Sequence, residues 1–247
     1  MYAAGFTDTG NARSINQDAI FVANEPVGPL PNLFIVADGM GGHNAGEVAS
    51  SQAVEAVVDY IRKFKVAELV QPDNYLDLLV TAAQEANSKV CKLAEDNSAM
   101  EGMGTTLTAC TITGEKVIII HVGDSRVYAI SPSGITQITN DHTHIEEMLQ
   151  AGQITAKEAA THPSRHVITR ALGVPGDFKM DGLIYPLGDI AAILLCSDGL
   201  SNMLNNGKIK EIVDIESFVE HRAKLLIKEA NAHGGHDNIS AILIDIK

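Results

Sequence analysis

The positions of hydrophobic residues predict several groups of strands, separated by groups of helices. Short runs of continuous aliphatic residues, bounded by Gly, Asp or Pro, predict buried strands. Two longer segments, 47–64 and 76–94, instead carry apolar residues at a helical period, which predicts two amphipathic helices. The predicted strands cover residues 2–7, 19–23, 33–37, 105–113, 116–122, 126–131, 135–139, 180–185, 190–196 and 239–246.

Very short links separate the four strands predicted between residues 105 and 139. The links read Thr-Gly-Glu, Gly-Asp-Ser and Pro-Ser-Gly, and such links predict one antiparallel meander. Short helical pieces are expected between 145 and about 172, and a last long helix runs to about 232. Capping-box spacing marks two helix starts, at Thr155 with Glu158 and at Ser217 with Glu220.

The order of the predicted elements indicates the fold class. Strands come first, then two helices, four strands, small helices, two strands, helices and a final strand. A doubly wound fold would alternate strands and helices regularly, whereas this order suits an α+β fold with largely antiparallel sheets stacked on each other and helices outside. No repeat, low-complexity tract or long linker interrupts the pattern, so we expect one domain over residues 1–247.

Composition narrows the class of protein. The 18 basic and 31 acidic residues give a net charge of −13, which argues against non-specific binding to nucleic acid or anionic membranes. An anionic substrate would have to be attracted by local cations. No apolar run approaches the roughly 18 residues of a membrane span, and no signal peptide is visible, so we expect no membrane anchor and a cytoplasmic location. The three cysteines lack CxxC spacing, which predicts small buried side chains in a reducing compartment.

Three carboxylates stand at or just beyond the ends of predicted strands. Asp38, Asp124 and Asp198 each follow a run of aliphatic residues. Carboxylates are rarely buried unpaired because desolvation disfavours the charged form. Three of them at strand ends predict one edge of a sheet where negative charge gathers around cations, and hence the chemistry of a hard metal ion.

Other motifs carry weaker signals when taken singly. Arg13 lies five residues before Asp18, and an Arg fork is the usual partner of phosphate oxygens, although most Arg–Asp pairs are surface contacts. The glycine-rich run that begins at Asp38 matches neither a dinucleotide fingerprint nor a P-loop, so an ordinary tight turn is an equal alternative. Asp237 stands in a Gly-Gly-His-Asp-Asn turn before the last strand.

Together these motifs resemble one family, the metal-dependent protein serine/threonine phosphatases of type 2C, also called the PPM family. The motifs occur in the family's order and span nearly the whole chain. The segment HPSRHVITRALG at 162–173 resembles the flap of the family's bacterial branch. The matching motifs are RSINQD at 13–18, DGMGGH at 38–43, GTT at 104–106, GDSR at 123–126, SDGL at 197–200 and GGHDN at 234–238.

The resemblance implies a four-layer αββα sandwich, with two largely antiparallel central sheets flanked by helices and a small helical flap at about 143–178. It also implies a cage for two Mn²⁺ or Mg²⁺ ions. Asp38 would bridge the two ions and the Gly39 carbonyl would bind one of them, while Asp198 and Asp237 would hold the other. Asp124, with Asp198, would hold a third ion. An all-oxygen shell suits these metals better than Zn²⁺.

The same resemblance implies an activity. A hydroxide bridging the ions would hydrolyse phosphoserine and phosphothreonine in proteins, while Arg13 binds the phosphate and Asp18 orients metal-bound water. The implied partners are a serine/threonine kinase and its substrates, and we expect a monomer. Some eukaryotic relatives carry a His directly after the Asp-Gly pair as a suggested general acid. Met40 stands there in this chain, so the general acid is unassigned; metal-bound water is one candidate, and His43 is either another or a helix-start residue.

Basic side chains gather in the segment 159–176, which contains no acid. They would either receive a phosphopeptide or, for Arg170, pack structurally. Arg126 is predicted to be a structural ion-pair partner. The basic residues of the segment are His162, Arg165, His166 and Arg170.

Alternative functions remain open at this point. A cysteine phosphatase is excluded because no Arg stands six residues after any Cys. A catalytically inactive relative that only binds phosphoproteins or metal is disfavoured because Arg13, Asp38, Asp198 and Asp237 are all present. A phosphatase for small phosphate esters is a further alternative.

Overall fold

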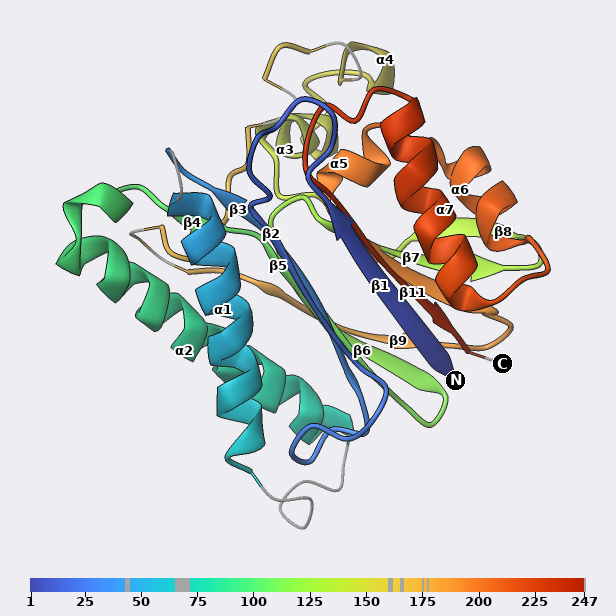
Figure 1. Ribbon diagram of the computed structural model, residues 1–247, viewed down its shortest axis with the longest axis horizontal. Coiled ribbons are helices and arrows are strands. Elements are labelled where there is room, and N and C mark those ends of the chain that lie inside the picture. Colours follow the sequence, from blue (N-terminus) through green and yellow to red (C-terminus); the bar gives the residue numbers. More distant parts are fainter. Residues whose placement is uncertain are drawn as a thin grey trace.

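A computed structural model describes residues 1–42, 45–64, 72–159, 162–164, 167–174, 176 and 178–246. Two antiparallel sheets lie face to face, and helices cover both outer faces (Figure 1). The first sheet has the strand order β1 (Tyr2–Asp8), β11 (Ile239–Asp245), β10 (Ala192–Cys196), β7 (Arg126–Ser131) and β8 (Gly134–Gln137). The second has the order β2 (Asp18–Ala23), β3 (Leu33–Met40), β5 (Leu107–Thr113), β6 (Lys116–Val122) and β9 (Asp181–Pro186), and β4 (Gly104–Thr105) pairs with the end of β3.

The helices form the outer layers. Two long helices cover the second sheet, and two others cover the first sheet (Figure 1). The remaining described helices are short. In chain order the helices are α1 (Ala45–Arg62), α2 (Pro72–Asp96), the short 3₁₀ helix η2 (Ser98–Met100), α3 (His144–Gln150), α4 (Ala156–Ala159), α5 (Asp198–Ser201), α6 (Asn206–Val213) and α7 (Val219–Ala232).

Three apolar layers hold the sandwich together. Phe34 and Ile242 belong to the layer between the sheets. Ile35, the next residue of β3, faces α1 and α2 instead, and Leu194 faces α6 and α7. Because both faces of each central strand are covered, these strands read as continuous aliphatic runs rather than alternating ones. The predicted αββα sandwich is confirmed.

The predicted four-strand meander is wrong. β5 pairs with β6 in the second sheet, whereas β7 pairs with β8 in the first. The Gly-Asp-Ser link therefore carries the chain from one sheet to the other. Gly123 has φ +107°, and a Cβ there would lie 2.5 Å from the Thr106 side chain, so glycine is needed at the crossing point. Link length alone cannot separate a hairpin from this short crossover.

The two predicted capping boxes differ in outcome. Thr155 and Glu158 exchange hydrogen bonds in both directions, at 2.8 Å and 3.4 Å, so the first is confirmed. The second is wrong, because α7 begins after Phe218 and the Ser217 hydroxyl pairs with the His221 ring instead, at 2.9 Å.

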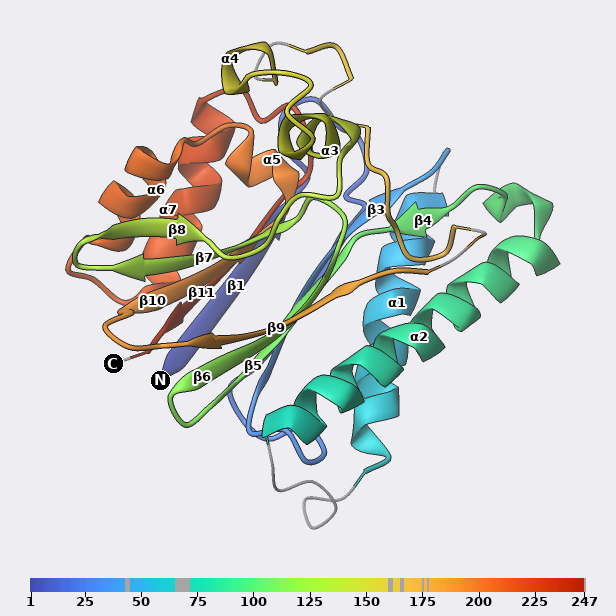
Figure 2. The same cartoon turned by 180° about the vertical axis from the view of Figure 1, so that it is seen from behind.

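The segment that joins β8 to β9 lies over one end of the sandwich and holds α3 and α4 (Figures 1 and 2). Its described return path, 167–174, is not helical, in contrast to the expectation. Two isolated bridges, between Thr143 and Ile168 and between Thr105 and Leu172, hold the return path against the body. None of the described helices is long and apolar enough to cross a membrane.

Candidate metal centre

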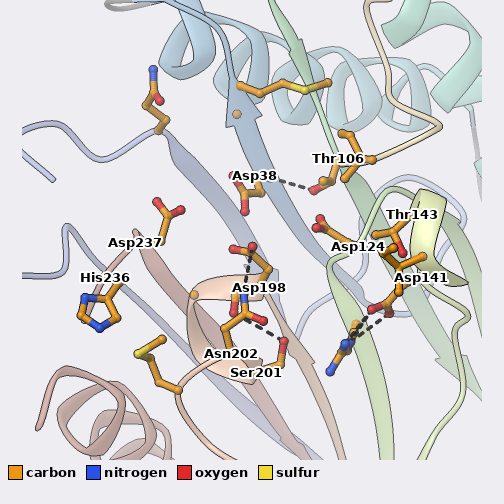
Figure 3. A pocket seen from close by; sticks show the side chains of 18 of the residues that line it. Asp38, Thr106, Asp124, Asp141, Thr143, Asp198, Ser201, Asn202, His236 and Asp237 are labelled. Atoms are coloured by element: carbon orange, nitrogen blue, oxygen red, sulfur yellow. Dashed lines mark hydrogen bonds and ion pairs between the residues drawn. The ribbon is translucent and has the colours of Figure 1, made fainter. Parts of the chain in front are cut away.

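The predicted carboxylates meet at the end of the sandwich that lies beneath α3. A cavity of about 920 Å³ opens there. Asp38, Asp124, Asp198 and Asp237 all line it, and Figure 3 shows their carboxylates directed toward one shared space. The strand pattern predicted that the carboxylates share one edge of a sheet, and this prediction is wrong. Asp38 belongs to the second sheet, Asp198 and Asp237 flank strands of the first, and Asp124 lies in the crossover between the two.

Asp38 is held through its own backbone N–H and carbonyl groups by Thr105 and Thr106. Its N–H donates to the Thr106 hydroxyl at 2.9 Å, and its carbonyl accepts from the Thr106 N–H at 2.9 Å and the Thr105 hydroxyl at 3.0 Å. Burial raises the pKa of Asp38 well above its usual value, and the charges of neighbouring aspartates, first Asp18 and then Asp198, raise it further. The next residue, Gly39, also lines the cavity.

Asp18 stands opposite Asp38 in the β2–β3 ladder but is not among the residues that line the cavity. Its Oδ2 accepts hydrogen bonds from Ser197 at 2.8 Å and Ser240 at 2.6 Å. Its Oδ1 is buried and has no hydrogen-bond partner among the described residues. Burial raises the pKa of Asp18 to about 7, although the two hydroxyl groups oppose the shift. The orphaned oxygen fits an additional donor, such as a water molecule.

Asp124 occupies the crossover between the sheets. Burial raises its pKa to about 7, and the negative charges of Asp198 and Asp141 add to the shift. The following Ser125 lies 2.8 Å, hydroxyl to hydroxyl, from Thr106, the residue that also holds Asp38. Thr106, which holds Asp38, is therefore hydrogen-bonded to the residue that follows Asp124 in the chain.

Asp198 and Asp237 come from two segments that approach closely. Asp198 is the first residue of α5, and its Oδ2 accepts from the Asn202 amide at 3.0 Å. A Cβ at Gly199 would lie 1.9 Å from the Asn238 carbonyl oxygen, so only glycine allows α5 to pack this tightly against the turn that carries Asp237.

Arg13 lies at the rim of the cavity in an exposed loop. Its Nη2 donates to Asp237 Oδ2 at 2.9 Å. Asn238 fixes the loop that carries Arg13, because its buried amide donates to the Thr9 and Ile15 carbonyls, both at 2.9 Å, and accepts from the Gln17 N–H at 2.8 Å. The turn before β11 thus positions a carboxylate and a guanidinium together.

The donor set fits hard divalent cations. The carboxylates raise one another's pKa, so a positive charge in the cavity would relieve their repulsion. In the described part of the chain, no three His, Cys, Asp or Glu side chains come close enough to enclose an ion by themselves. Magnesium-like ions usually keep several waters and bind one or two carboxylates, so this spacing suits them better than Zn²⁺.

Several residues that shape the centre were assigned no role from the sequence. Ser197, Ser240 and Asn238 hold Asp18 and the Arg13 loop. Ser197 and Asn238 lie within the SDGL and GGHDN motifs, and Ser240 lies in no motif, but nothing in the sequence indicates these contacts. The ion pair predicted for Arg126 is present, with two nitrogens on the Asp141 carboxylate at 2.9 Å and 2.6 Å. Met40 lines the cavity, whereas His43, Arg165 and His166 lie outside the described residues.

Comparison with known proteins agrees with this geometry. Residues 10–243 match the family described as Protein phosphatase 2C, and the chain belongs to that family. The class of enzyme predicted from the motifs is thereby confirmed.

Individual relatives are similar over almost their full length. Serine/threonine phosphatase Stp of Listeria innocua is 36% identical, covering 99% of this chain and 96% of the relative. Serine/threonine phosphatase Stp1 from Staphylococcus aureus has a solved structure with a TM-score of 0.88 and 34% identity, covering 99% of this chain and 94% of that one. The catalytic domain of the serine threonine protein phosphatase PstP, solved in complex with two manganese ions, has a TM-score of 0.81 and 32% identity, covering 99% of this chain and 97% of that one.

Proposed function

We propose that this protein hydrolyses phosphoserine and phosphothreonine in proteins and depends on Mn²⁺ or Mg²⁺ to do so. The observation that carries the proposal is the convergence of Asp38, Asp198, Asp237 and Arg13 on one cavity of about 920 Å³. Relatives with serine/threonine phosphatase names, one of them solved in complex with two manganese ions, support it.

The oxygen donors that line the cavity are the proposed metal ligands. Asp38 and the Gly39 carbonyl would hold one ion, and Asp38, Asp198 and Asp237 would hold the other. Bound water would complete both coordination shells, because these carboxylates do not enclose an ion by themselves in the described part of the chain. Two such ions supply Lewis acidity toward the phosphoryl oxygens and an activated water for attack on phosphorus. Asp124 and Asp198 would hold a third ion, a proposal supported by the position of both residues in the lining of the cavity.

Arg13 and Asp18 act on the substrate and the solvent. The Arg13 guanidinium has donors that fit phosphate oxygens, and its exposed position at the rim lets it turn from Asp237 to an incoming phosphate. Asp18 accepts a hydrogen bond from water at Oδ1, which leaves its Oδ2 on the two serine hydroxyls. This arrangement orients the water without placing Asp18 in the cavity itself.

The wider setting is also part of the proposal. Residues 1–247 act as one catalytic domain, with 143–178 as its flap. The enzyme works as a cytoplasmic monomer on the products of a serine/threonine kinase. Because the net charge of the chain is −13, phosphoproteins would be attracted by positive charges close to the cavity and not by the charge of the protein as a whole.

Substrate class is tested by comparing kcat/KM for a phosphothreonine peptide, a phosphotyrosine peptide and a small aryl phosphate in Mn²⁺. The proposal predicts that the phosphothreonine peptide is preferred over both. Equal or better turnover of the aryl phosphate would indicate a phosphatase for small esters. Binding of the phosphopeptide without phosphate release would indicate an inactive relative.

A further inference from the structure

His142 holds both peptide groups of the turn that carries Asp124. The backbone N–H of His142 donates to the Gly123 carbonyl at 2.8 Å, and its ring Nδ1 lies 3.1 Å from the Gly123 N–H. The side chain is only 4% exposed. Gly123 is the residue with φ +107° at the crossover between the sheets, so His142 fixes the point from which Asp124 projects.

These contacts determine the tautomer of the ring. A backbone N–H can only donate, so Nδ1 of His142 is the acceptor. The single N–H proton of the neutral ring is therefore on Nε2. The Nε2–H then donates to Asp181 Oδ2 at 3.2 Å. Arg170 Nη1 also lies 3.2 Å from Nε2, but both atoms carry hydrogen, so Arg170 is bound through Asp181 Oδ1 at 3.1 Å.

Further contacts fix the orientation of the ring. The His121 ring packs against it with 4.7 Å between centroids, and His121 is itself bound to the Thr108 hydroxyl at 2.9 Å and the Asn140 carbonyl at 3.0 Å. The His142 carbonyl accepts from the Thr169 N–H at 2.8 Å. The return path of the 143–178 segment therefore touches His142 through both Thr169 and Arg170.

None of these supporting side chains reaches the reacting groups. Asp141 and Thr143, the sequence neighbours of His142, line the cavity beside Asp124 (Figure 3). His142, Arg170 and Asp181 are not among the lining residues. Any effect of the His142 side chain on catalysis must therefore be exerted through the turn that it holds.

We propose that His142 is a positioning residue for Asp124, and that Asp181 and Arg170 keep the His142 ring in the orientation and tautomer that the turn requires. The proposal rests on the proposed function, in which Asp124 helps to hold an outer metal ion. Of the two roles considered for Arg170, the proposal favours structural packing over direct contact with a phosphopeptide.

The test uses two variants of His142, one that keeps a hydrogen-bond acceptor for the Gly123 N–H and one that does not. In His142→Asn the side-chain oxygen replaces Nδ1 and can still accept from Gly123, whereas His142→Leu cannot. We expect Mn²⁺ at the weakest site to bind at least about tenfold more weakly in His142→Leu, with a matching fall in kcat, and within about threefold of wild type in His142→Asn. Calorimetry with Mn²⁺ alone and phosphopeptide kinetics provide the readouts. Equal weak-site affinity in His142→Leu and wild type would overturn the proposal.

A double-mutant cycle separates positioning from a general structural effect. If His142 acts through Asp124, adding His142→Leu to Asp124→Ala lowers kcat no further. Multiplied losses in the double variant would overturn the proposal.

Arg170→Met, at a partly exposed position, provides a variant that is less disruptive to folding, with about threefold weaker outer-site binding expected. Wild-type metal binding in Asp124→Ala would overturn both this inference and the third ion. Loss of activity in Asp38→Ala would still support the phosphatase itself.

Discussion

Asp18 and Asp38 are direct cross-strand partners in the antiparallel β2–β3 ladder. Like charges at opposite positions destabilise such a pair, and burial adds to the cost here. Burial and neighbouring negative charge raise the pKa of both carboxyl groups. The β2–β3 hairpin is thus built with a local charge conflict that a bound cation would relieve.

The first prediction concerns stability without metal. Asp38→Asn removes one charge from this conflict, so the metal-free variant should be about 1–2 kcal/mol more stable than metal-free wild type. Wild type should gain about 3 kcal/mol when Mn²⁺ is present at a hundredfold excess over its Kd, and the variant should gain much less. Denaturant unfolding with chelator and with Mn²⁺ measures both. An equal Mn²⁺ gain in Asp38→Asn would contradict the prediction.

The second prediction concerns Arg13. Loss of charge-assisted hydrogen bonds to phosphate in Arg13→Ala should lower kcat/KM for a phosphothreonine peptide by about 10–100-fold. Binding of Mn²⁺ to the core site should persist, because no core ligand is removed. Arg62→Ala, at an exposed position in the last turn of α1, is the matched control and should leave kcat/KM unchanged. A similar loss in both variants would refute a specific role for Arg13.

The third prediction concerns Asn238, which makes three hydrogen bonds to the loop that carries Arg13. Asn238→Ala leaves two carbonyls and one N–H of that loop without their partner. It should destabilise the protein by about 2–4 kcal/mol and raise KM, because Arg13 loses its fixed position. Asn205→Ala, which removes the N-cap of α6, should cost about 1 kcal/mol and leave KM unchanged. An unchanged KM in Asn238→Ala would show that the loop is held by other contacts.

The fourth prediction concerns pH. Burial lowers the pKa of His121 to about 4, and the proximity of His142 contributes. Below about pH 6.5 the unfolded chain binds a proton at His121 that the folded protein does not, so stability is lost as pH falls toward 4. The stability difference between wild type and His121→Gln should therefore shrink by up to about 3 kcal/mol between pH 7 and pH 4. Urea unfolding across this range measures it, and a constant difference would contradict the lowered pKa.

Local patterns predicted most of the elements because each depends on near neighbours. Continuous aliphatic runs identified β3, β6 and β10, and the helical period identified α1 and α2 within a few residues of their ends. The sheet to which a strand belongs depends instead on distant partners. The Gly-Asp-Ser link therefore looked like a hairpin turn, although it crosses between sheets.

The residues of the candidate centre also fall into those that could be predicted from the sequence and those that could not. Asp38, Asp124 and Asp198 were visible because a carboxylate after an apolar strand is unusual, and Asp237 became visible only through the resemblance to a family. The residues that hold them were not visible. His142 and Asp181 meet across 39 positions in the sequence, and Ser240 reaches Asp18 across 222. Only the folded arrangement of two sheets creates such contacts.

The central claim is that the carboxylate cavity carries out metal-dependent hydrolysis of phosphoproteins. Its most direct test is phosphate release from a phosphothreonine peptide, titrated with Mn²⁺, for wild type, Asp38→Ala and the exposed-site control Asp189→Ala. Release should rise to saturation with Mn²⁺ in wild type and in the control, and should fall by at least about a hundredfold in Asp38→Ala. Release that persists in chelator, or wild-type release from Asp38→Ala, would contradict the claim.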